Sequence, residues 1–170
     1  MKGYLGREDL TRSAFLDGWY VTGDIAAFDE DGFIRITDRM SRFSKIGGEM
    51  VPHGKIEQAL QEAAKRMEQT FAVTAVPDER KGERLVVLHA CHATVMDEAL
   101  AVMVTMGLPN LFIPQRRLCF EVGTLPLLGS GKLDLKAIKQ LAIQASNDLE
   151  GRVGKSDETK EESEEPQSSP

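Results

Sequence analysis

The pattern of apolar and polar positions changes from strand-like to helical within the first seventy residues. YVTGDIAAF and FIRITDR alternate branched or aromatic residues with polar ones, and DEDG lies between them. This pattern predicts an antiparallel ribbon over residues 19–39. Residues 53–68 repeat apolar side chains at helical spacing and predict a helix. Its expected core positions are Ile56, Leu60, Ala63 and Ala64, and the positions expected to face solvent are Glu57, Gln58, Gln61 and Glu62.

Three more strands and two more helices follow from the same rules. TFAVTAVPD and ERLVVLHACHAT read as strands separated by a polar loop, and MDEALAVMVTMG reads as a helix that ends near Gly107. QRRLCFEVGTLP contains a third strand, and DLKAIKQLAIQAS a final helix. The sequence therefore predicts an α+β fold, in which an antiparallel ribbon precedes a small three-stranded sheet with helices.

Charge separates the end of the chain from the rest. Residues 146–170 hold eight acidic and three basic residues, which leaves 19 acidic and 18 basic residues in positions 1–145. The nearly neutral body argues against a nucleic-acid partner bound through a broad basic face. The acidic tail has almost no apolar residues, so we expect residues 146–170 to be disordered.

The chain has no apolar stretch of the roughly 18 residues that cross a bilayer, and its first residues lack an apolar signal core. We therefore expect it in the cytoplasm, or at the inner face of the membrane as part of a larger protein. His89, Cys91 and His92 lie close together in LHACHA, which suggests a metal site. Their spacing fits strand packing better and lacks a second pair of ligands, so no metal site is predicted.

Two segments carry the chemical information. They are GWYVTGDIAAFDEDGFIRITDRMSRFSKIGGEMV and, later in the chain, LPLLGSGKLDLKAIK. Together, and in this order, they resemble the late core motifs of the adenylate-forming (AMP-binding) superfamily of acyl- and aryl-CoA synthetases. The resemblance covers residues 1–145. It implies that residues 1–39 end the amino-terminal adenylation domain, that residues 40–145 form the mobile carboxyl-terminal lid domain, and that 146–170 form the tail.

The resemblance assigns three residues to the nucleotide. Lys132, next to Gly129-Ser130-Gly131, matches the catalytic lysine, whose positive charge would stabilise the transition state at the α-phosphate of ATP. Asp24 matches the residue that accepts both ribose hydroxyls, and Arg39 a second ribose or phosphate contact. From the residues alone, Lys132 reads as a surface lysine in a turn and Asp24 as a turn residue.

The resemblance also implies a rotation of the lid. The hinge position is Ser41, where the superfamily usually has aspartate or lysine, and serine can also absorb the change in φ and ψ. The segment that faces the active site after rotation matches Lys45, Gly47, Gly48 and Glu49. From the residues alone, this segment reads as a plain hairpin turn.

Within the superfamily, GGEMVPH resembles acyl-[acyl-carrier-protein] synthetases that also act as 2-acylglycerophosphoethanolamine acyltransferases. This implies a fatty acid ligase that uses ATP with Mg²⁺, then transfers the acyl group to the phosphopantetheine of acyl carrier protein or to CoA. The sequence contains no phosphate-binding loop and no acyl pocket. We therefore expect an amino-terminal adenylation domain to supply both, and the isolated chain to be inactive. The alternative is a non-catalytic remnant or interaction module that retains the lid fold.

Overall fold

The computed structural model describes residues 1–161, and the side chains as far as Gly151. The chain divides into two compact units, Met1–Arg42 and a second unit that begins at Phe43. No helix within the described residues is long and apolar enough to cross a membrane.

The first unit consists of short elements. Helix α1 (Glu8–Ser13) precedes the paired strands β1 (Phe15–Leu16) and β2 (Trp19–Tyr20). Strands β3 (Asp24–Phe28) and β4 (Ile34–Arg39) form an antiparallel ribbon, and the 3₁₀ turn η1 (Met40–Arg42) ends the unit. The predicted ribbon is thus present from Asp24 onward. Trp19 and Tyr20 pair with the preceding strand instead, because Asp17 and Gly18 form a two-residue turn with φ values of 50° and 82°. Gly23, at a φ of 74°, then interrupts the extended backbone before β3.

The second unit begins with a hairpin and continues as a helix-covered sheet. Its elements, in order, are β5 (Phe43–Ile46), β6 (Glu49–Pro52), α2 (His53–Ala63), β7 (Phe71–Asp78), β8 (Gly82–His89), α3 (Ala93–Thr105), η2 (Asn110–Phe112), η3 (Arg116–Leu118), β9 (Cys119–Glu121) and α4 (Leu135–Glu161). The sheet order is β7-β8-β9, with β7 and β8 antiparallel and β9 parallel to β8. This confirms the predicted α+β class and the three-stranded sheet.

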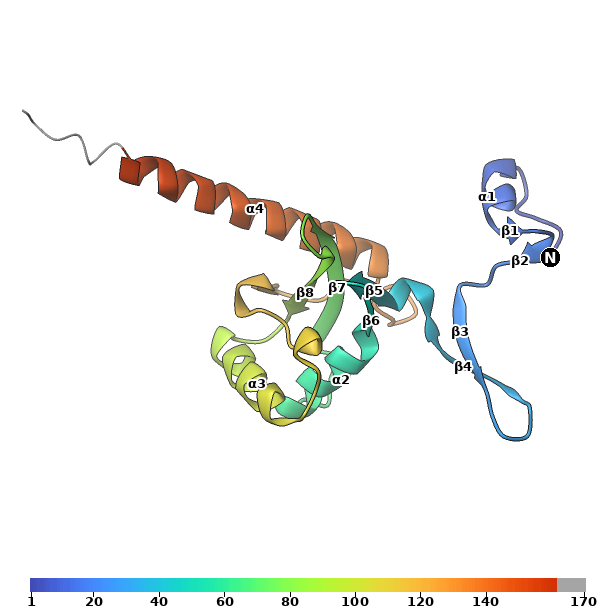
Figure 1. Cartoon of the computed structure of the whole chain (residues 1–170), viewed down its shortest axis with the longest axis horizontal. Coiled ribbons are helices and arrows are strands. Elements are labelled where there is room, and N and C mark those ends of the chain that lie inside the picture. Colours follow the sequence, from blue (N-terminus) through green and yellow to red (C-terminus); the bar gives the residue numbers. More distant parts are fainter. Residues whose placement is uncertain (162–170) are drawn as a thin grey trace, which may run out of the picture. The chain divides into compact units, whose positions relative to one another are not determined.

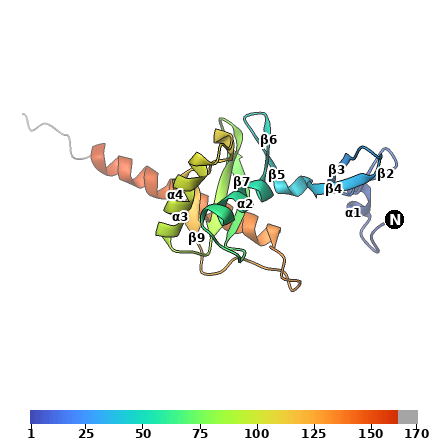
Figure 2. The ribbon, with the colours of Figure 1, turned by 90° about the horizontal axis from the view of Figure 1, so that it is seen from below.

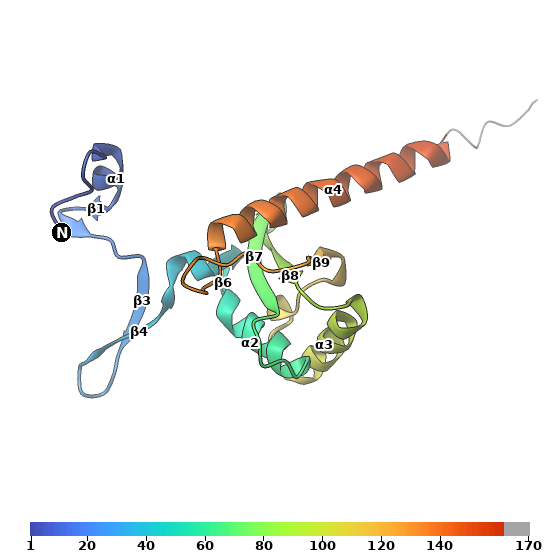
Figure 3. The same ribbon diagram turned by 180° about the vertical axis from the view of Figure 1, so that it is seen from behind.

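Helices cover both faces of this sheet (Figure 1). Alternate residues of β7 point to opposite sides: Phe71 and Val73 pack with α2 and α3, and Ala72 and Val76 pack with α4. Seen from behind, α4 lies along the sheet on the side away from α2 and α3 (Figure 3). Coverage on both faces explains why β7 is almost wholly apolar rather than alternating.

Two sequence expectations differ from the structure. Glu57 was expected to face solvent, but it is buried in α2 with 6% exposure, and its Oε1 accepts a hydrogen bond from the Val73 amide at 2.8 Å. The expected start of the disordered tail, residue 146, lies inside α4, which continues to Glu161. Ser146 is buried and Leu149 packs on the cluster around Ile138, so the apolar face of α4 extends beyond the end of the predicted helix. Residues 162–170 of the predicted tail lie outside the described residues.

Candidate functional site

Lys132 lies on a short hairpin-like loop between β9 and α4. Leu127 and Leu133 form an antiparallel bridge, and the Leu128 amide donates to the Lys132 carbonyl at 2.7 Å. The turn closes where the Gly131 amide donates to the Leu128 carbonyl at 2.8 Å, with Gly131 at a φ of 79°. These bonds fix the backbone on both sides of Lys132, while its side chain is exposed and makes no ion pair with the described residues.

The start of α4 is fixed directly after this lysine. The Asp134 carboxylate accepts hydrogen bonds from the amides of Lys136 and Ala137 at 3.1 and 3.0 Å. This is the arrangement of an N-cap, and the cap lies two residues after Lys132. The lysine therefore protrudes from an anchored turn at the head of a helix.

Asp24 and Arg39 lie opposite each other in the β3–β4 ribbon. Their Cα positions are partners in the register, and Arg39 Nε lies 2.8 Å from Asp24 Oδ1. The Asp24 side chain is 18% exposed and that of Arg39 is 64% exposed. The Asp24 amide also donates to Thr22 Oγ1 at 3.2 Å, so the aspartate is held from both its side chain and its backbone. Both residues belong to the first unit, whereas Lys132 belongs to the second.

The remaining residues of the resemblance lie at and just after the division of the chain. Ser41 is exposed in η1, next to the boundary between Arg42 and Phe43. Lys45 is the next-to-last residue of β5, Gly47 and Gly48 form the two-residue turn of the β5–β6 hairpin, and Glu49 begins β6. Gly47 and Gly48 have φ values of 58° and 95°, as a type I′ turn requires.

The hairpin turn and the Lys132 loop extend in opposite directions from the second unit. In Figure 2 the turn between β5 and β6 lies above the sheet, near the β7–β8 turn, and the loop between β9 and α4 lies below the sheet. The two groups of residues that the sequence singled out are thus not brought together within this unit. They form two separate exposed surfaces.

Sequence reasoning missed a buried polar pair beneath the hairpin. Ser44 Oγ and His53 Nε2 lie 2.6 Å apart, and the two residues are 2% and 4% exposed. A usable signal was present: Ser44 shares one face of β5 with Ile46, and a lone hydroxyl on a buried apolar face needs a partner.

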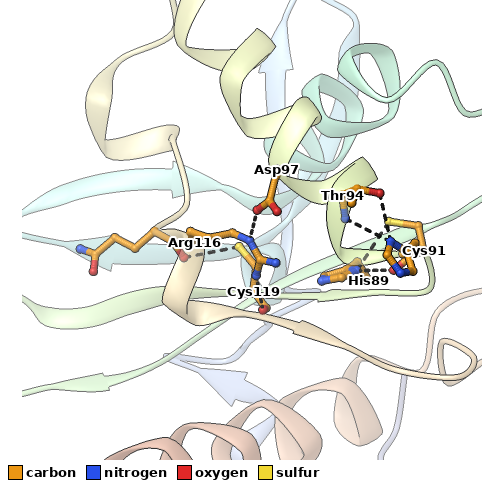
Figure 4. A network of polar contacts seen from close by, with 8 residues as sticks. His89, Cys91, Thr94, Asp97, Arg116 and Cys119 are labelled. Carbon is orange, nitrogen blue, oxygen red and sulfur yellow. Dashed lines mark hydrogen bonds and ion pairs between the residues drawn. The ribbon is translucent and has the colours of Figure 1, made fainter. Parts of the chain in front are cut away.

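The histidine and cysteine residues of LHACHA have structural contacts (Figure 4). His89 Nδ1 lies 2.9 Å from the Cys91 carbonyl oxygen, and His92 caps α3 by accepting from the Thr94 amide. Among the side chains that the structure describes, as far as Gly151, no group of three or more His, Cys, Asp or Glu residues is placed to hold an ion. Burial raises the pKa of the Cys119 thiol to about 12, so it is not activated as a nucleophile.

A groove of about 780 Å³ opens between the β7–β8 turn and α4, and its lining includes none of the predicted site residues. Asp78, Glu79 and Glu150 offset three arginines in its lining, Arg80, Arg84 and Arg117. Arg84 also pairs with Asp78 and Glu150. The charge of this groove therefore selects no class of ligand.

Comparisons with known proteins show which proteins this chain is similar to. No protein-family model matches it. The chain is 31% identical to 2-succinylbenzoate–CoA ligase of Listeria monocytogenes over 138 residues, which are 81% of this chain and 29% of the relative. It is 45% identical to a long-chain-fatty-acid–CoA ligase of Yersinia pestis over 83 residues, 49% of this chain and 14% of the relative.

A solved structure gives the same answer. The o-succinylbenzoate CoA synthetase of Bacillus subtilis, in complex with its acyl-adenylate intermediate, superposes with a TM-score of 0.64 and 28% identity. The match covers 82% of this chain and 28% of that structure. This chain spans less than a third of the curated relatives that it matches. By sequence and fold, it corresponds to the carboxyl-terminal portion of acyl- and aryl-CoA ligases of the adenylate-forming superfamily.

Proposed function

We propose that this chain is the mobile lid of an ATP-dependent fatty acid ligase that works with an amino-terminal adenylation domain. The acid displaces pyrophosphate from ATP to form acyl-AMP, and a pantetheine thiol then displaces AMP to form a thioester. The observation that carries this proposal is Lys132, an exposed lysine on a turn fixed by hydrogen bonds, with no ion-pair partner among the side chains of residues 1–151.

Lys132 would act in the first step. An acid anion and the α-phosphate repel each other, and charge concentrates on the phosphate oxygens as the carboxylate attacks. A fixed ammonium group at that point stabilises the developing charge more than it stabilises the separate reactants. The turn and the Asp134 cap supply the fixed backbone that this role requires.

Asp24 and Arg39 would hold the ribose of the nucleotide. A carboxylate accepts two hydroxyl donors side by side, and a guanidinium on one of its oxygens fixes the direction of the other. The pair is suited to this because Arg39 Nε lies 2.8 Å from Asp24 Oδ1 as an ion pair, which holds the carboxylate in place. The Mg²⁺ that accompanies ATP would be held by the phosphates and the adenylation domain.

Ser41 and the β5–β6 hairpin would act in the second step. Ser41 lies in η1, the last three residues of the first unit, where a change in φ and ψ would rotate the lid. Rotation would move the Lys132 loop out of the active site and bring in the surface formed by Lys45, Gly47, Gly48 and Glu49. The two surfaces extend in opposite directions from the sheet, which supports alternate use in the two steps (Figure 2).

The ribbon of the first unit supports an adenylation domain as partner. Ala26 pairs with Ile36 and Phe28 with Ile34, which places these four side chains on one face. Phe28, Ile34 and Ile36 are 75%, 66% and 68% exposed. A two-stranded ribbon with an uncovered apolar face is marginal in water and needs a covering surface.

The acid substrate is proposed to be a fatty acid, and the acceptor the phosphopantetheine of acyl carrier protein or of CoA. The long-chain-fatty-acid–CoA ligase of Yersinia pestis supports the acid, since it shares 45% identity over the matched 83 residues. The GGEMVPH segment supports acyl carrier protein by its resemblance to acyl-[acyl-carrier-protein] synthetases, and the similarity to CoA ligases supports CoA, so the proposal keeps both acceptors.

Half-reaction kinetics of the complete enzyme, with its adenylation domain, test this function. We expect Lys132→Ala to slow acyl-adenylate formation by about 100- to 1000-fold, as the loss of one oxyanion donor does, and to leave transfer from preformed acyl-adenylate nearly unchanged. Lys136→Ala, which removes another exposed lysine four residues away, is the matched control and should change neither step. Equal loss of both half-reactions in Lys132→Ala would show that this role is wrong.

A further inference from the structure

A buried hydrogen bond joins the base of the β5–β6 hairpin to the first residue of α2. Ser44 lies in β5 opposite Val51, and Phe43 pairs with Pro52, so that His53 follows directly at the end of the ladder. Ser44 Oγ and His53 Nε2 are 2.6 Å apart, in an interior that contains Val51, Ile56 and other apolar residues. The bond therefore spans the point where the hairpin becomes a helix.

Burying two polar side chains here offers no gain in packing. An unpaired hydroxyl in an apolar interior costs about 1–3 kcal/mol, and the Ser44 hydroxyl avoids this cost only while it faces His53. Apolar residues of similar volume would fill the same space and would tolerate small shifts of the hairpin. A hydrogen bond has a narrow range of distance and angle, and thus defines one pose.

Further hydrogen bonds attach α2 and the tip of the hairpin to strands β7 and β8 and to the turn between them. One helical turn after His53, buried Glu57 accepts from the Val73 amide at 2.8 Å. Nearer the tip, the Lys45 amide donates to Glu83 Oε2 at 2.7 Å, and the Gly47 amide donates to the Lys81 carbonyl at 2.9 Å. The hairpin is thus tethered at its base by Ser44 and at its tip by the β7–β8 strands.

We propose that Ser44 and His53 are positioning residues that set the pose of the β5–β6 hairpin for acyl transfer to the thiol. This inference rests on the proposed function and names the residues that act behind its thiol-transfer surface. Neither residue reaches that surface, since both are buried. They affect acyl transfer indirectly, by fixing the orientation of Lys45, Gly47 and Gly48.

The test measures both half-reactions of the complete enzyme with Ser44→Ala, Ser44→Thr and Ser146→Ala. We expect Ser44→Ala to slow transfer from preformed acyl-adenylate by about tenfold and to raise the KM for the thiol, while adenylation changes by less than about twofold. Ser44→Thr keeps the hydroxyl and should recover most of the transfer rate. Ser146→Ala makes the same chemical change at the same 2% exposure but on α4, and should leave both steps unchanged.

A double-mutant cycle separates this role from a general loss of stability. Ser44→Ala, His53→Gln and the double variant should have non-additive effects on transfer, because each single change removes the same bond. Equal loss of both half-reactions, additive effects, or wild-type transfer by Ser44→Ala would each overturn the inference while leaving the proposed function intact. If the parent enzyme transferred no acyl group to a thiol, the proposed function would fail, and this inference with it.

Discussion

At the scale of single residues, His89 is a buried ionisable group of the second unit. It is 1% exposed, its Nδ1 faces the Cys91 carbonyl oxygen, and its buried Nε2 has no hydrogen-bond partner among the described residues (Figure 4). Burial lowers the pKa of His89, and Arg116 lowers it further. The contact with Cys91 and the charges of Glu121 and Asp97 oppose this shift. The folded protein therefore keeps His89 neutral to a lower pH than the unfolded chain does.

We expect the free energy of unfolding to fall as the pH drops below the ordinary histidine pKa of 6.5. In that range the unfolded chain binds a proton at His89 that the folded chain does not yet bind, so acid favours unfolding. Urea unfolding between about pH 7.5 and about pH 5.5 measures this loss, and His89→Gln should reduce it. His92→Asn is the control, since it removes an exposed histidine but keeps a side chain that can cap α3. An unchanged pH dependence in His89→Gln would contradict the assignment.

At the scale of elements, the turn of the β5–β6 hairpin is both a structural and a proposed functional feature. Positive φ at Gly47 and Gly48 is demanded by the two-residue turn itself, whatever its role in catalysis. A Cβ added at either position meets no atom within 4 Å, so a side chain there would project into open space. Asparagine tolerates positive φ, whereas leucine at Gly48 would cost about 1–2 kcal/mol of backbone strain.

We therefore expect Gly47→Asn to slow thioester formation and to spare adenylation, because its side chain enters the space proposed for the thiol arm. Gly48→Leu should give the same pattern together with a lower melting temperature, which makes Gly47→Asn the cleaner variant. Single-turnover measurement of each half-reaction, alongside thermal unfolding, distinguishes obstruction from strain. Poor adenylation with normal transfer in Gly47→Asn would contradict the proposed rotation of the lid.

At the scale of the whole molecule, the two units differ in how completely they bury apolar side chains. The second unit has apolar clusters on both faces of its sheet, whereas Trp19, Phe28 and Phe33 of the first unit are 80%, 75% and 70% exposed. The second unit thus has a core of its own. The first unit has the surface expected of a segment that packs against a larger domain.

We expect residues 1–170 alone to show no sustained release of pyrophosphate from ATP and palmitate, because most contacts to both substrates would come from the adenylation domain. Hydrogen exchange gives an independent readout. Amides of the β3–β4 ribbon should exchange rapidly in the isolated chain and become protected in the complete enzyme, while those of β7 should be protected in both. Sustained turnover by residues 1–170 alone would refute the proposal that a separate adenylation domain binds most of both substrates.

Much of the second unit follows from the sequence alone. Helical and alternating periodicities predicted α2, α3, β7 and β8 near their observed positions, because each pattern reflects which face of a single element is apolar. Turn residues predicted the bends that present Lys132 and Gly47, since positive φ and tight turns depend on local sterics. The roles of Lys132, Asp24 and Arg39 remain predictions from the resemblance.

Tertiary structure decided the partners of buried polar groups and the extent of the last helix. Helical periodicity placed Glu57 on the solvent side, but an amide of β7 makes its burial favourable. Ser44 and His53 are nine residues apart, and only the closed hairpin brings them together. The helix α4 continues past residue 146 because the sheet offers Leu149 an apolar surface. Local sequence encodes which groups can bond or pack, whereas the partner comes from a distant segment that only the folded chain brings near.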